Sequence, residues 1–172
     1  MIAERTAKLQ APIEEVKIEQ IPFNTLTKQE FDELWLYKPI KIRGIFDHEK
    51  ETLVGRTRHD DRGYEVITPL YTSVDPRTGA LKGIFVNRGR ISFEHQHSRM
   101  HLTPPNEEQV VEGILMYTEH DAKSVEGQPA NSTGHIRIDL EEFSKKTDLS
   151  NLNFANTLYL KSVQFTMDGT IE

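Results

Sequence analysis

Two stretches of this chain, residues 63–70 and 84–89, have the two-residue alternation of extended strands. Between them, Asp75 and Pro76 favour a tight turn, and Gly79 can take the positive φ that the exit of the turn needs. A strand, a short glycine-containing loop and a second strand predict a β-hairpin. Apolar side chains occupy both faces of its second strand, so we expect this hairpin to lie inside a barrel or sandwich.

A helical period appears over about residues 28–37. Thr27 and Glu30 have the spacing of a capping box at the start of this segment. The apolar stripe that follows consists of Phe31, Leu34 and Trp35. Pro39 forces the residue before it into an extended conformation. These signals predict one helix that lies on a sheet.

Short apolar segments elsewhere predict the remaining strands. They lie near residues 16–18, 40–44, 53–54, 110–117, 136–140 and 158–165, with a possible short helix over 139–146. Glycines occur within or at the ends of these strands. Gly44 predicts a bulge or a close approach of another backbone, and Gly55 is expected to stop its strand. Residues 56–62 are interpreted as a charged loop, and residues 92–108 and 118–134 as long polar connections.

These elements predict a fold of the β-rich α+β class, a small barrel or sandwich of about seven strands with one N-terminal helix packed on it. No crossover helices separate the strands, so we expect mainly antiparallel pairing. The sequence contains no internal repeat and no composition break. We therefore expect a single domain over residues 1–172, with an extended N-terminal arm over about residues 1–24.

Composition excludes several classes of function. The net charge of −6 and the lack of a basic stripe disfavour nucleic-acid binding. The chain has no cysteine, which excludes disulfides, thiolate metal sites and thiol nucleophiles. No segment has the ~18 consecutive apolar residues of a membrane span, so we expect a chain without a transmembrane helix of its own.

The candidate chemistry in the sequence is sparse. His95, His97 and His101 are the one cluster with metal-like spacing, because residues two apart on an extended segment share a face. A solvated loop explains them better, since no matching carboxylates accompany them. His48 with Glu49, and His59 with Asp60 and Asp61, could supply acid–base pairs, but we interpret both sets as charged turns. No nucleophile or phosphate-binding motif occurs, so we expect no catalytic, cofactor or metal site and a protein that is not an enzyme.

Asn87, Arg88 and Gly89 end the second strand of the hairpin. Strand termination is one explanation for them. The other is a contact with a partner, because the planar guanidinium of Arg88 suits a carboxylate. The sequence favours the first explanation and leaves the second open. Gly63, at the start of the hairpin, is expected to resist a β-branched side chain if its φ is positive.

Five segments occur in an order that resembles the Surfeit locus protein 1 family, the cytochrome c oxidase assembly factors of mitochondria and many bacteria. They are residues 42–48, 51–56, 63–70, 86–89 and 111–113. The resemblance is good over about residues 34–117 and weaker outside them. The family-motif residues, which are also the candidate partner contacts, are Gly44, Gly55, Arg56, Gly63, Tyr64, Thr68, Pro69, Asn87, Arg88 and Gly89.

The chain also departs from the family pattern. Members usually carry two transmembrane helices around a domain that faces the intermembrane space or the periplasm, and neither helix is predicted here. Arg90 stands where the family often has tryptophan after Asn-Arg-Gly. Haem handling in the family has been linked to a histidine in a membrane helix, so the resemblance implies no cofactor for this chain.

The resemblance implies a non-enzymatic accessory subunit or assembly factor of respiratory complex IV. Its expected partners are cytochrome c oxidase subunits or assembly intermediates. The expected location is the intermembrane-space side of the mitochondrial inner membrane, or the bacterial periplasm, with the membrane reached through protein partners. A soluble haem-type ligand-binding barrel is the alternative, and a hydrolase or metal enzyme is the third possibility.

Overall fold

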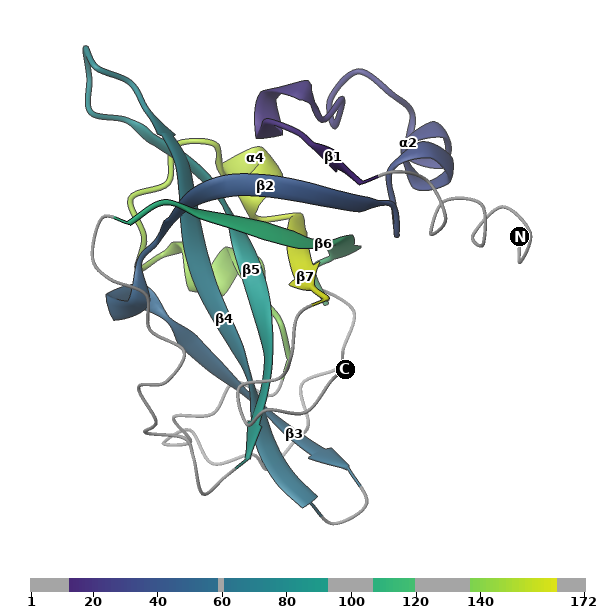
Figure 1. The fold of residues 1–172 in the computed structure, drawn as a ribbon, viewed down its shortest axis with the longest axis vertical. Coiled ribbons are helices and arrows are strands. Elements are labelled where there is room, and N and C mark those ends of the chain that lie inside the picture. The colour runs from purple at the N-terminus through teal and green to yellow at the C-terminus, as the bar shows by residue number, and fades with distance from the viewer. Residues whose placement is uncertain (1–12, 59–60, 93–106, 120–136, 164–172) are drawn as a thin grey trace.

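The computed structural model describes residues 13–58, 61–92, 107–119 and 137–163 (Figure 1). The strands are β1 (Glu14–Glu15), β2 (Pro39–Phe46), β3 (Thr52–Arg58), β4 (Asp61–Val74), β5 (Leu81–Ser92), β6 (Gln109–Tyr117) and β7 (Leu158–Ser162). The helices are α2 (Lys28–Leu34), α3 (Leu140–Ser144) and α4 (Leu152–Ala155), with 3-10 turns η1 (Ile18–Gln20) and η2 (His48–Lys50). No helix in these residues is both long enough and apolar enough to span a membrane.

The seven strands form one sheet in the order β1-β2-β6-β7-β5-β4-β3, and β2 also pairs with β4. This additional pairing joins Ile45 to Tyr71 and Phe46 to Leu70. It closes β2, β6, β7, β5 and β4 into a five-stranded barrel, with β1 and β3 outside the closed ring. The β-rich fold with few helices is therefore confirmed, and of the two predicted architectures the barrel is the observed one.

The barrel interior is filled by side chains from every strand of the closed ring. The buried strand residues of this cluster are Ile40, Ile42, Phe46, Leu70, Ile84, Val86, Val111, Leu115, Leu158 and Leu160. Phe31 of α2 and Phe154 of α4 join the same cluster. Because the side chains of a strand alternate between its two faces, other apolar residues of these strands form a second cluster on the outer face.

The outer cluster lies where residues 138–149 cover β4, β5 and β7. Its covering side chains are Ile138, Leu140, Phe143 and Leu149. Phe143 packs edge-on against Phe85 of β5, with 6.3 Å between ring centroids. The predicted short helix is confirmed as α3, whose N-cap Asp139 accepts a hydrogen bond from the Glu142 amide.

The predicted hairpin is confirmed as β4 and β5, which pair antiparallel along most of their length. Asp75 caps the turn by accepting a hydrogen bond of 2.8 Å from the Arg77 amide, and Gly79 has φ 73°. Figure 1 shows the turn end of this hairpin extending past β2. Pairing is antiparallel as expected except at β1–β2 and β5–β7, which are parallel. In the sequence, β6, α3 and α4 lie between β5 and β7. This long connection lets β5 and β7 run parallel, although no single helix joins them.

The predicted capping box begins α2. The Thr27 hydroxyl accepts from the Glu30 amide, and the Glu30 carboxylate accepts from the Thr27 amide at 3.3 Å. The helix ends at Leu34, three residues before the predicted end at 37, and Tyr37 has a left-handed φ of 63°. The predicted stripe is also incomplete, because Phe31 is buried whereas Leu34 is 58% exposed.

Several sequence-based boundaries are wrong. Gly55 does not stop its strand, because β3 continues to Arg58 and β4 begins at Asp61. Most of the expected charged loop is therefore paired strand. In the N-terminal arm, β1 lies just before the predicted segment, and Val16 and Ile18 are buried in the core. Residues 137–139 form no strand, and α4 was not predicted.

Candidate functional site

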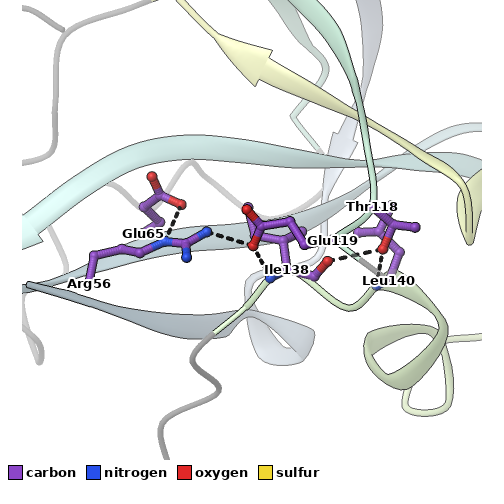
Figure 2. Close-up of polar contacts among 6 residues, drawn as sticks. All are labelled: Arg56, Glu65, Thr118, Glu119, Ile138 and Leu140. Carbon is purple, nitrogen blue, oxygen red and sulfur yellow. Dashed lines mark hydrogen bonds and ion pairs between the residues drawn. The ribbon is translucent and has the colours of Figure 1, made fainter. Parts of the chain in front are cut away.

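Arg56 of β3 holds together two carboxylates that are far apart in the sequence (Figure 2). Its Nε donates to Glu65 of β4 at 3.2 Å, and its Nη2 donates to Glu119 at 2.8 Å. Burial alone would lower the pKa of Arg56, but the hydrogen bond to Glu119 and the charge of Glu65 outweigh burial and raise it. Arg56 is therefore a firmly charged tether rather than a free surface contact.

Glu119 also fixes the segment that leads into α3. It accepts a hydrogen bond of 2.7 Å from the Ile138 amide, and its own amide donates to the Ile138 carbonyl. Next to it, the Thr118 hydroxyl donates to the Ile138 carbonyl and accepts from the Leu140 amide (Figure 2). We call these contacts the Thr118–Leu140 clasp. Through Arg56, β3 is linked to this clasp.

Asn87, Arg88 and Gly89 form a bulge in β5. Glu65 pairs with Arg90 and Ile67 pairs with Asn87, so one residue of β4 faces two residues of β5. Gly89 has φ 111°, which a residue with a Cβ rarely adopts, and its amide donates to Asn87 Oδ1 at 3.0 Å. The bulge turns Arg90 to the same outer face as Asn87.

A pocket of about 310 Å³ opens on this outer face, in the residues that the structure describes. Its lining residues are Arg56, Glu65, Asn87, Arg90, Met116, Glu119, Tyr159 and Lys161. Neighbouring strands supply them in register, because Asn87 pairs with Lys161, and Tyr159 pairs with Met116. The bulge and the Arg56 tether therefore shape one site, which we call the outer pocket.

Gly63 makes room for the Arg90 side chain. A Cβ at Gly63 would lie 2.6 Å from the Arg90 guanidinium carbon and 2.7 Å from the Ile91 carbonyl oxygen. Among the described glycines, positive φ is recorded at Gly79 and Gly89 and not at Gly63. The expectation that Gly63 is special is supported by close approach and not by its φ.

Arg88 points to the other side of β5, the side of the barrel interior. Its guanidinium lies 4.2 Å from the centroid of the Phe46 ring, and its Nη1 lies 3.4 Å from Nδ1 of His48. Glu51 accepts from the hydroxyl of the fully buried Thr68 at 2.9 Å and lies 3.7 Å from the same His48 nitrogen. Burial lowers the pKa of Arg88 to about 10, against a smaller opposing effect of Glu51. These contacts form one partly buried polar cluster, which we call the inner cluster and which consists of His48, Glu51, Thr68 and Arg88.

The remaining family-motif residues have structural roles in the sheet. Pro69 lies between the part of β4 that pairs with β3 and the part that pairs with β2, so its missing N–H leaves no ladder bond unmade. Gly44 lets β2 approach β4, because a Cβ there would lie 2.6 Å from the Tyr71 carbonyl oxygen. Gly55 and Tyr64 pair directly across β3 and β4.

A second and larger groove, of about 770 Å³, lies between the N-terminal segment and strands β2 and β4. Arg43 spans it, donating to Glu15 at 2.6 Å and to Glu108 at 3.2 Å. All three side chains are about half exposed, so these ion pairs contribute little to stability.

The sequence did not single out the carboxylates and the tyrosine as site residues, although Glu51 and Glu65 lie in two of the segments that resemble the family. Glu51, Glu65, Glu119 and Tyr159 come from four different segments, and no local motif links any of them to its partner. The predicted histidine cluster at residues 95–101 lies outside the described residues. Within those that are described, no three His, Cys, Asp or Glu side chains form a metal-sized group.

The family model of the SURF1 family matches residues 1–169. The chain belongs to this family. It is 32% identical to Surfeit locus protein 1 of Gallus gallus over 147 residues, which cover 75% of this chain and 45% of that relative. The chain thus spans about half the length of the curated relative it matches. The five segments that suggested the family lie in β2 with η2, β3, β4, β5 and β6. Of their polar motif residues, Arg56 and Asn87 line the outer pocket. Thr68 and Arg88 belong to the inner cluster.

Proposed function

We propose that the chain is the protein-binding β-domain of a cytochrome c oxidase assembly factor or accessory subunit, acting without catalysing a reaction. Membership in the SURF1 family over residues 1–169 is the observation that carries this proposal. The proposed partners are oxidase subunits or their assembly intermediates. The proposed place of action is the intermembrane-space side of the mitochondrial inner membrane, reached through protein contacts.

The side-chain contacts support a rigid scaffold. Arg56 is held by Glu65 and Glu119, and Thr68 is held by Glu51. These polar groups join strands and connections that are distant in the sequence. A barrel fixed in this way can present its outer surface to a partner with little loss of conformational entropy on binding.

The packed interior disfavours the alternative of a haem-type ligand inside the barrel. Ile84, Val86 and Leu160, which face the interior, are fully buried in the apolar cluster that fills it. A ligand as large as haem would have to displace several such side chains, each of which contributes about 1.5–3 kcal/mol by being buried. A haem titration followed by Soret absorbance tests this alternative directly, and a saturable shift at equimolar haem would revive it.

Native gel electrophoresis in mild detergent, with mass spectrometry of the band that contains the tagged chain, tests the proposal. We expect comigration with oxidase. Comigration with complete, active oxidase assigns an accessory subunit, and comigration with incomplete intermediates assigns an assembly factor. Leu160→Asp, tagged in the same way, controls for capture of an unfolded chain, because Leu160 is fully buried. A well-folded chain that migrates alone in both preparations would contradict the proposal.

A further inference from the structure

The outer pocket contains hydrogen-bonding groups that the fold itself does not use. Tyr159 is only 4% exposed and Asn87 only 2%, yet both line the pocket. Among the described residues, the Tyr159 hydroxyl and the Asn87 side-chain amide nitrogen have no hydrogen-bond partner, and the Lys161 ammonium has no ion pair. Neither the hydroxyl nor the amide nitrogen belongs to the fully buried side-chain atoms that lack a partner, so both reach the pocket, where they are available as donors to a ligand.

These groups lie side by side because of strand register. Asn87 and Lys161 are direct partners across the parallel β5–β7 pair, and Tyr159 is one step away on the same face. All three can donate hydrogen bonds, and Lys161 adds a positive charge. The ligand atoms that they favour are therefore acceptors that carry negative charge.

The charges around the pocket limit the charge of this ligand. Arg56, Arg90 and Lys161 carry three positive charges, and Glu65 and Glu119 carry two negative ones. The two glutamates are held by Arg56 on one side of the pocket. These two carboxylates would repel a phosphate dianion more strongly than a ligand with a single negative charge.

The remaining wall is apolar. The Met116 side chain and the Tyr159 ring come from paired positions on β6 and β7 and line the pocket together. A volume of about 310 Å³ is at the small end of the range for ligand sites. It suits a carboxylate attached to a short apolar stem.

We infer that the outer pocket binds a monoanionic carboxylate with a short apolar stem, oriented by Lys161, Asn87 and Tyr159. The carboxylate can come from a free small acid or from the C-terminus of a protein chain, since both present the same chemistry. Carboxylate binding here is independent of oxidase contact, so either property can fail without the other.

Titration of the full-length, ¹⁵N-labelled chain with sodium butyrate at constant ionic strength tests the inference. We expect a saturable shift of the Asn87 side-chain amide signal. Lys161→Met and Tyr159→Phe should each weaken butyrate binding about tenfold, since each removes a donor to a charged group. Lys82→Met is the matched control, because Lys82 is an exposed lysine of β5 outside the pocket.

Two further probes complete the experiment. Butylammonium, which has a stem of the same length and the opposite charge, should not shift the Asn87 signal. Tri-alanine with a free C-terminus distinguishes the two sources of the carboxylate. Tighter binding than that of butyrate assigns the carboxylate to a protein chain end. Weaker binding assigns it to a small acid. The inference is overturned if butyrate gives no saturable shift, if amidated tri-alanine binds as well as the free form, or if both pocket variants fold and bind butyrate like wild type.

Discussion

Arg56 and Glu119 are 63 residues apart in the sequence, and their side chains form an ion pair of 2.8 Å. Arg56 lies on β3, outside the closed ring, and Glu119 follows the end of β6. Since Glu119 also holds Ile138, one ion pair links the edge strand to the segment that covers the outer core. The family-motif residue Arg56 therefore has a structural partner in the fold.

Removal of this link should destabilise the barrel. In Arg56→Met, two carboxylates that are only 16% and 35% exposed lose their cation. We expect the free energy of unfolding to fall by about 1–2 kcal/mol, less than for a fully buried pair because solvent screens these charges. Urea unfolding followed by circular dichroism measures this change.

Arg62→Met is the control for Arg56→Met, because Arg62 is an exposed arginine on the neighbouring strand β4. We expect it to change the free energy of unfolding by less than about 0.5 kcal/mol. Equal effects of the two substitutions would show that the tether contributes nothing specific.

The sequence predicted those features that depend on neighbours along the chain. Asp75 and Gly79 form the turn as expected, and Thr27 caps α2. Strand ends and long-range partners were not predictable in this way. Gly55 was expected to end a strand, but pairing with Tyr64 of β4 carries the strand through it. Such pairing depends on tertiary contacts that override local preference.

The candidate site shows the same division. Asn87, Arg88 and Gly89 were singled out as a group, but their bulge depends on the register with β4, which one strand alone does not specify. Glu119 and Tyr159, which line the same pocket, lie at least 30 residues further along the chain and carry no motif of their own. Family resemblance identified Asn87 of β5 and Arg56 of β3, and only the fold brought Glu119 and Tyr159 to the same pocket.

Gly63 provides a second stability test. In Gly63→Ala the new Cβ would meet the Ile91 carbonyl oxygen at 2.7 Å, a distance that backbone movement has to relieve. We expect a loss of about 1–3 kcal/mol, measured by thermal and urea unfolding. Arg90→Ala in the same chain should not restore stability, because the backbone contact remains. Full restoration would show that the Arg90 side chain alone requires the glycine.

Arg88 tests whether the inner cluster serves folding or partner binding. Arg88→Ala removes the cation over the Phe46 ring and one of the positive charges near Glu51. We expect the free energy of unfolding to fall by about 1–2 kcal/mol. Arg88→Lys should recover part of this loss, since it keeps the charge but not the planar fork.

The partner-contact hypothesis for Arg88 predicts a different pattern. Comigration of Arg88→Ala with oxidase would then fall while its unfolding curve stays like that of the wild type. Measuring both properties on the same preparation separates the two roles. A parallel loss of stability and comigration assigns Arg88 to the fold.

Alkaline pH should destabilise the protein through three tyrosines. Burial, assisted by hydrogen bonds to Asp47 and Asp32, raises the pKa values of Tyr71 and Tyr117 above the ordinary tyrosine value. Burial and the charges of Glu119 and Glu65 raise the pKa of Tyr159 in the same way. Because the unfolded chain releases these protons near pH 10 and the folded chain keeps them, their stabilising contribution is complete below about pH 10 and is lost as pH rises further.

Phenolate absorbance near 295 nm, followed with circular dichroism from pH 8 to pH 12, measures this effect. The three tyrosines whose pKa values are raised should ionise together with unfolding. The lowered pKa of Arg88, about 10, acts in the opposite direction, because the folded chain then releases a proton that the unfolded chain keeps. Three groups outweigh one, so the unfolding free energy should still fall. Tyr117→Phe should make this fall shallower, and an unfolding free energy that stays constant between pH 9 and pH 11.5 would contradict the burial of these phenols.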